Sequence, residues 1–188
     1  MDLVLFGIQG SGKGTQAKKL AAEFGYEIFE AGAELRKIAA SKSELGKTVK
    51  SFIDVGNLVP YDIIMEVTRQ AILARPKTQK ILFDGVPRDL NQMRDFDAIM
   101  AEAGRKFRCV QLTLDPGLGI GRVMGRAKKE GRIDDADEEV IHRRMQTFME
   151  KTLPVIGHYK RKKNLIEIDG NREMEEVYED LKKVTARA

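Results

Sequence analysis

The chain has 188 residues, of which 42% are hydrophobic and 33% charged, proportions that indicate a globular protein and exclude a fibrous or disordered one. Its apolar runs are far shorter than the roughly 20 residues that a membrane span needs, so we expect no membrane partner. The 33 Lys and Arg against 29 Asp and Glu give a net charge of +4, which suits an anionic ligand but is modest for a nucleic-acid binder.

Strand-like residues occupy positions 2–6, with no basic or apolar leader pattern before them, so we expect a cytoplasmic protein. Longer helical patterns separate this run from later ones, an alternation typical of a parallel sheet flanked by helices. We therefore expect an α/β fold with five parallel strands. The apolar β-rich runs are 3–6, 81–83, 110–114 and 165–168, with a weaker one at 26–29.

The region between residues 32 and 75 contains no strand pattern. It holds helical stretches at 45–53 and 63–73, which predict a helical insertion in an otherwise regular βα rhythm. Two later segments also show helical periodicity and are expected to pack on the sheet. Their apolar positions are Val140, Ile141, Met145, Phe148 and Met149 in one, and Met174, Val177, Leu181 and Val184 in the other.

Three isolated features favour structural interpretations. The single cysteine, Cys109, cannot form an internal disulfide and lies in a strand-like run, so we expect a core residue. His142 and His158 are sixteen residues apart without cysteine neighbours, which is poor metal-ligand spacing, and we expect them at the surface. The basic run 160–163 follows a predicted helix, whose negative dipole end favours cations.

A glycine-rich loop joins the first predicted strand to the helical residues 16–24. It reads Gly7-Ile8-Gln9-Gly10-Ser11-Gly12-Lys13-Gly14-Thr15. Glycines allow the backbone N–H groups to converge on phosphate oxygens, the helix N-terminus adds its positive dipole end, and Lys13 adds a full charge. The loop therefore predicts a nucleotide phosphate site.

The residues Gly12-Lys13-Gly14-Thr15-Gln16 resemble those of the adenylate kinase family of nucleoside monophosphate kinases. The resemblance implies a P-loop NTPase fold with a five-stranded parallel sheet. It also implies a single domain whose core spans residues 1–30, 75–125 and 133–188, with an acceptor-binding helical insertion at about 31–74 and a short lid at about 126–132.

A carboxylate and a hydroxyl are candidates for the metal side of this site. Asp84 ends a predicted parallel strand, where a carboxylate can orient hydrated Mg²⁺. Gly14 occupies the usual Ser/Thr position of the phosphate loop, and the hydroxyl comes one residue later, at Thr15. By resemblance, Mg²⁺ is held near Asp84 and Thr15 largely through water.

Three further segments resemble the acceptor site of the family: 32–36, 56–60 and 84–88. The resemblance implies that arginines hold the phosphate of AMP and that Gln92 reads the base, since an amide can donate and accept together. The implied AMP-binding residues are Ala31, Arg36, Asn57, Leu58, Val59, Gly85, Val86, Pro87, Arg88, Gln92, Arg132 and Arg143.

Several positions depart from the family pattern. Ala33 and Tyr61 stand where aspartates are common, and Val86 replaces a phenylalanine. Ala31 is typical of UMP/CMP kinases, which leaves that activity as an alternative, whereas Gln92 favours AMP. A nucleotide-binding protein without kinase activity is a second alternative.

Phosphoryl transfer needs convergent positive charge, because the charge of the moving group spreads over its equatorial oxygens. The resemblance implies ATP binding by Gly10, Ser11, Gly12, Lys13, Gly14, Thr15, Arg122, Arg126 and Arg172. It implies catalytic roles for Lys13, Arg88, Arg126, Arg132 and Arg143, with Asp134 and Asp135 orienting arginines. Only residues 127–131 separate Arg126 from Arg132, which leaves no room for a long lid or its zinc cysteines.

The resemblance thus implies the activity of the adenylate kinase family, in which a phosphoryl group is transferred reversibly from MgATP to AMP, in line, giving two ADP. We expect small nucleotides as its partners, Mg²⁺ but no zinc, no nucleic acid, and a monomer.

Overall fold

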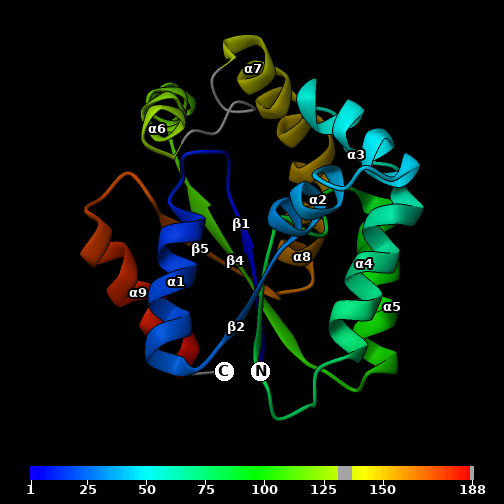
Figure 1. Cartoon of the computed structure of the whole chain (residues 1–188). Helices are drawn as coiled ribbons and strands as arrows, with labels where there is room; N and C mark the ends of the chain where they lie inside the picture. Colours follow the sequence, from blue (N-terminus) through cyan, green and yellow to red (C-terminus); the bar gives the residue numbers. More distant parts are fainter. Residues whose placement is uncertain (131–136, 187–188) are drawn as a thin grey trace.

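The computed structural model describes residues 1–130 and 137–186, with the backbone alone for 126–130. Five parallel strands form one sheet in the order β2-β3-β1-β4-β5, which confirms the predicted sheet (Figure 1). Its central strand has all five residues buried, which explains why it reads as a continuous apolar run. The strands are β1 (Asp2–Phe6), β2 (Glu27–Glu30), β3 (Ile81–Asp84), β4 (Phe107–Thr113) and β5 (Leu165–Asp169).

Helices cover both faces of the sheet. Alternate residues of β1 point to opposite faces, so Leu3 and Leu5 pack with α1 (Lys13–Phe24) and α9 (Met174–Ala186). Val4 and Phe6 pack on the other face with α4 (Tyr61–Leu73), α5 (Leu90–Glu102) and α8 (Leu153–Arg161). Figure 1 shows these two helical layers with the sheet between them. Cys109 belongs to the second core and is fully buried, as predicted.

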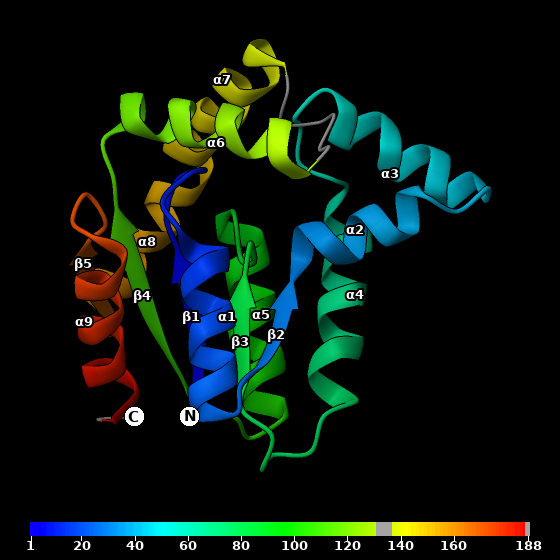
Figure 2. The same ribbon diagram turned by 60° about the vertical axis from the view of Figure 1, so that its left-hand side comes forward.

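Three helices lie between β2 and β3, where the sequence predicted two. The additional helix is α2 (Ala31–Ala39), in which only Ala31 is fully buried and Leu35 packs partly against the core, an apolar face too short for the sequence pattern to have indicated a helix. It is followed by α3 (Glu44–Asp54), whose N-cap Ser43 accepts a hydrogen bond from the backbone N–H of Gly46, and by α4. Figure 2 shows α2 and α3 reaching outward beside the carboxyl ends of the strands.

A second group of helices stands over the same edge of the sheet (Figure 2). These are α6 (Pro116–Glu130) and α7 (Glu138–Thr147), separated by residues that lie outside the described part of the chain. The periodic segment at residues 140–149, expected as one helix, is interrupted by a π-helical turn, η2 (Phe148–Thr152), which connects α7 to α8. No helix among the described residues is long and apolar enough to cross a bilayer.

The two histidines differ in environment. His142 is exposed on α7, as predicted. His158 is half-buried on α8, where its ring contacts that of Tyr159, so the prediction of a surface position was wrong for this residue. His158 lies on α8 next to the buried Tyr159. The sequence argument considered only the spacing of metal ligands and did not predict which face of this helix is buried.

Candidate active site

The carboxyl ends of the strands open on a cavity of about 1020 Å³. Its walls come from the loop after β1, from α2, from residues 53–59, from the loop after β3, from α6 and α7, and from the loop after β5. Ligands of open parallel sheets bind at this edge, because the loops that follow neighbouring strands meet there.

The glycine loop forms one end of the cavity. Gly10 and Gly12 have positive φ angles of 80° and 87°, and a Cβ on Gly10 would lie 2.5 Å from the carbonyl oxygen of Gly119. Helix α1 begins at Lys13 with no side-chain cap, which leaves its first backbone N–H groups facing an incoming anion. The Lys13 ammonium donates to the carbonyl oxygens of Gly7 and Ile8, at 2.7 and 3.1 Å.

Three arginines lie toward the other end of the cavity: Arg36 on α2, Arg88 after β3 and Arg144 on α7. Desolvation of its charge by the surrounding protein lowers the pKa of Arg88. The residue is nevertheless exposed, because its side chain borders the open cavity. The negative charge of Asp84 opposes this shift, the positive charges of Arg144 and Arg36 add to it, and Glu30 opposes it weakly. The charges of Arg36 and Arg144 thus act on Arg88, and the three guanidinium groups line one part of the cavity, where together they could bind an anion.

The Arg88 backbone is held from two sides. Its N–H donates to the Gln92 side-chain oxygen at 2.8 Å, and its carbonyl oxygen accepts from the Thr152 hydroxyl at 2.9 Å. Its side chain donates from Nε to the carbonyl oxygen of Gly85, also at 2.9 Å. The amide oxygen of Gln92 therefore already has a partner, and its amide nitrogen is the group that this cavity-lining residue can offer to a base.

Most residues singled out in the sequence come together on the cavity wall. They are Gly10, Ser11, Gly12, Lys13, Gly14, Thr15, Ala31, Arg36, Asn57, Leu58, Val59, Asp84, Gly85, Arg88, Gln92, Arg122 and Arg172. Val86 and Pro87 are buried behind it, so their side chains shape the loop from the core. Arg132 and the side chain of Arg126 lie outside the described part of the chain, as do Asp134 and Asp135.

The two arginines of α7 differ in position. Arg143, the residue named from the sequence, is exposed and does not line the cavity, whereas the neighbouring Arg144 does. Arg144 follows the buried Val140 by one helical turn, and its Nη2 lies 3.4 Å from the carbonyl oxygen of Ile53. The close approach of α7 depends on Gly56, where a Cβ would lie 3.0 Å from the Val140 carbonyl oxygen and 3.3 Å from Arg144 Cγ. Arg144 stands four residues after the buried Val140 and three after the buried Ile141. Arg143 stands only two after Ile141, and this spacing was the signal that could have selected Arg144.

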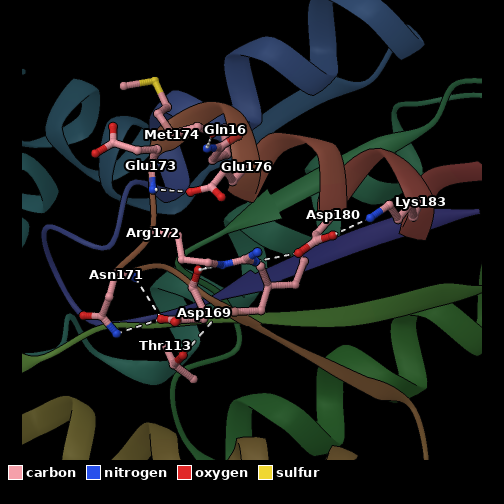
Figure 3. A network of polar contacts seen from close by, with 11 residues as sticks. Gln16, Thr113, Asp169, Asn171, Arg172, Glu173, Met174, Glu176, Asp180 and Lys183 are labelled. Carbon is pink, nitrogen blue, oxygen red and sulfur yellow. Dashed lines mark hydrogen bonds and ion pairs between the residues drawn. The ribbon is translucent and has the colours of Figure 1, made fainter.

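The loop after β5 borders the phosphate-loop end of the cavity. Figure 3 shows the Arg172 guanidinium directed at Asp180 of α9. The two side chains form an ion pair with an N–O distance of 2.5 Å. Lys183 and Arg172 together lower the pKa of Asp180 to about 2. Arg172 can thus border the nucleotide site while its charge is compensated by Asp180 on α9. Arg122 lies closer to the phosphate loop, with Nη1 3.4 Å from the Gly10 carbonyl oxygen.

Asn171 connects this loop to the start of α6. Its side-chain oxygen accepts from the backbone N–H of Asp115 at 3.1 Å. Its amide nitrogen donates to the Asp169 carboxylate, a contact drawn in Figure 3, at 2.7 Å. Hydrogen bonds from the Asn171 backbone and side chain lower the pKa of Asp169. These contacts join β5 to α6, the helix that carries Arg122.

A divalent metal would find oxygen ligands beside the phosphate loop. Asp84 and Thr15 both line the cavity and offer a carboxylate and a hydroxyl, groups that Mg²⁺ prefers. Within residues 1–130 and 137–186, no cluster of three or more His, Cys, Asp or Glu side chains is placed to hold a metal by itself. The donor set therefore fits Mg²⁺ that shares its coordination with water and substrate phosphates.

Comparisons with known proteins agree with this site. A family model described as adenylate kinase matches residues 5–164. An adenylate kinase of Stenotrophomonas maltophilia is 37% identical over 178 residues, covering 94% of this chain and 95% of that protein. Adenylate kinases of Thermus thermophilus (36%, covering 94% and 92%) and Flavobacterium johnsoniae (35%, covering 98% and 97%) are similar over comparable lengths. The chain, with its glycine loop and arginine cluster at two ends of one cavity, therefore belongs to the adenylate kinase family.

Proposed function

We propose that this chain is an adenylate kinase, which transfers a phosphoryl group reversibly from MgATP to AMP and gives two ADP. The observation that carries the proposal is a single cavity with an anion site at each end: the glycine loop with Lys13, and the arginine group of Arg36, Arg88 and Arg144. A donor and an acceptor phosphate bound at these two ends would meet in the space between them.

The reaction is direct, because the acceptor is already an anion and needs no general base. A phosphate oxygen of AMP attacks the γ-phosphorus of ATP in line, and the bond from that phosphorus to the β,γ-bridging oxygen breaks. Bound Mg²⁺ would neutralise charge on the donor phosphates, with Asp84 and Thr15 as its nearest protein oxygens. Lys13 and the arginines stabilise the charge of the transferred group.

The division of the chain follows from these roles. We assign acceptor binding to the insertion at about 31–74 and lid closure to about 126–132. The remaining residues form the core, which contains the sheet. We propose that Arg126 binds ATP and that Arg132 stabilises the phosphoryl group during its transfer. Closure excludes water, which would otherwise hydrolyse ATP in the same site.

The acceptor base is proposed to be adenine. The supporting group is Gln92, which is 3% exposed and lines the cavity, with an amide nitrogen available to donate to a base acceptor. Ala31 packs into the core at 1% exposure and presents no hydroxyl to the base. We further propose that the enzyme acts on free nucleotides as a cytoplasmic monomer, without zinc.

The proposal is tested by turnover of the purified chain with MgATP and each of AMP, CMP, UMP and GMP, together with a reaction that contains no acceptor. Formation of ADP that is fastest with AMP is the expected result. Preference for CMP or UMP would assign the chain to the pyrimidine-directed relatives. If ADP formed equally fast without an acceptor, the chain would be an ATPase and not a kinase.

A further inference from the structure

An acidic side chain lies among the arginines at the acceptor end of the cavity. Glu30 is the last residue of β2, and the parallel register pairs it with Asp84 at the end of β3. Its Oε1 accepts a hydrogen bond from Nη2 of Arg36 at 2.9 Å, and both residues line the cavity. Their side chains are 39% and 35% exposed, so this ion pair faces the space that the acceptor phosphate would enter.

Local geometry explains why Glu30 pairs with Arg36. Glu30 occupies the N-cap position of α2, but its side chain makes no capping hydrogen bond, and glutamate is not a preferred N-cap residue. The Arg36 side chain folds back over Gly32, where a Cβ would lie 3.2 Å from Arg36 Nη1. The first turn of α2 therefore leaves open the path along which the guanidinium reaches the carboxylate.

A carboxylate on this guanidinium imitates an acceptor phosphate. Both groups present oxygens to the planar N–H fork of arginine, so they compete for the same donors. A phosphate dianion beside a carboxylate is also repelled, and repulsion between like charges is costly where solvent is partly excluded.

We propose that Glu30 sets the affinity of the acceptor site, because its carboxylate occupies the Arg36 guanidinium that the phosphate of AMP must take over. This inference rests on the proposed function and adds a residue that the motif comparison does not include. Binding of AMP breaks the Glu30–Arg36 ion pair, and the wild-type chain therefore binds AMP more weakly than a chain with a neutral residue at position 30. A nucleoside without a phosphate does not experience this competition.

The test compares Glu30→Gln with Glu27→Gln. Both residues are glutamates of β2 that pair with an arginine, but Glu27 contacts Arg75 and does not line the cavity. Titration calorimetry would measure the Kd of AMP and of adenosine, and steady-state kinetics would measure KM for AMP and kcat. Glu30→Ala, a second neutral variant, guards against an effect particular to glutamine, and thermal melting checks that every variant is folded.

We expect Glu30→Gln to bind AMP about three- to tenfold more tightly, from the loss of a half-exposed ion pair and of the repulsion between carboxylate and phosphate. The change should fall on KM for AMP more than on kcat, Glu30→Ala should act in the same direction, and adenosine affinity should stay constant. Glu27→Gln should match the wild-type chain in every assay.

Two results would overturn the inference. Unchanged AMP affinity in folded Glu30→Gln would mean that breaking the Glu30–Arg36 ion pair does not weaken AMP binding. Weaker AMP binding would mean that Glu30 orients Arg36 for the phosphate instead of competing with it. Failure of the wild-type chain to bind or turn over AMP would be a different outcome, which removes the proposed function and with it this inference.

Discussion

The Thr152 hydroxyl donates a hydrogen bond to the Arg88 carbonyl oxygen across 2.9 Å, although the two residues are 64 positions apart in the chain. Thr152 is 5% exposed and belongs to the π-helical turn between α7 and α8. Since Arg144 is carried by α7, this turn connects the backbone of one cavity arginine to the helix that bears another.

Replacing Thr152 by Val should therefore disturb the position of Arg88. We expect kcat/KM for AMP to fall by about tenfold to 100-fold, since small misplacements of a phosphate-binding group have effects of this size. The Arg88 carbonyl oxygen would also lose this hydrogen bond, which is partly shielded from solvent, lowering the free energy of unfolding by about 1 kcal/mol. Kinetics and urea unfolding measure the two effects. Thr147→Val is the control, because the Thr147 hydroxyl bonds within its own helix to the Arg143 carbonyl oxygen. Reduced stability with unchanged kinetics would limit Thr152 to a structural role.

The two adjacent arginines of α7 provide a matched pair. Arg144→Ala should lower kcat by about 10³-fold or more, the scale of arginines that stabilise phosphoryl transfer. Arg143→Ala should stay close to the wild-type rate, because this side chain is exposed and does not line the cavity. Steady-state turnover with saturating MgATP and AMP, with circular dichroism as a folding control, distinguishes them. A larger loss in Arg143→Ala would reverse the assignment that the position of α7 supports.

Asp84 should determine how much Mg²⁺ the reaction requires. Asp84→Asn removes the carboxylate that would orient the hydrated ion, so we expect the Mg²⁺ concentration for half-maximal rate to rise by about tenfold or more. Chelation of Mg²⁺ should stop turnover in all variants. The measurement is rate against free Mg²⁺ at constant ATP, with the exposed Asp62→Asn as control. A lower rate with unchanged Mg²⁺ dependence would mean that Asp84 acts through the neighbouring Arg88 instead.

The stability of the fold should depend on Tyr26 at alkaline pH. Burial, assisted by the charge of Asp2, raises the pKa of Tyr26 to about 12. A tyrosine in the unfolded chain has a pKa of about 10. Between about pH 10 and 12 the hydroxyl is therefore ionised in the unfolded state but still protonated in the folded state, so the free energy of unfolding falls as the pH rises. Wild-type unfolding free energy should decline more steeply over this range than that of Tyr26→Phe, by up to about 1.4 kcal/mol per pH unit.

Urea unfolding at pH 8, 10 and 11 measures this difference in slope. Tyr61→Phe is the comparison, because the pKa of Tyr61 is also raised to about 12, chiefly by its hydrogen bond to Asp95, but the residue is 39% exposed. Solvent screening should make its effect smaller. Parallel slopes for wild-type and Tyr26→Phe would show that the buried hydroxyl does not contribute to alkaline unfolding.

The sequence by itself determined the features that depend on local chemistry. The buried strands appear as apolar runs, and the phosphate loop appears as glycines between a strand and a helix, because both requirements act on neighbouring residues. Asp84 could be placed at the ligand-binding edge for the same reason, since a residue that ends a parallel strand must lie there. The cavity-lining positions of Lys13 and Arg88 follow from these elements, whereas Arg36 lies on α2, a helix that the sequence pattern did not predict.

Only the tertiary structure decided which of several equivalent side chains reach the cavity. Each residue of a helix is rotated by about 100° from the one before it, so the packing of α7 against Gly56 selects Arg144 over Arg143. The contact of Thr152 with Arg88 depends on a π-helical turn, and the pairing of Glu30 with Arg36 depends on the turn from β2 into α2. A sequence pattern specifies the face that a residue occupies within its own element. The partner on that face is set by how the elements pack, through contacts between residues that are distant in sequence.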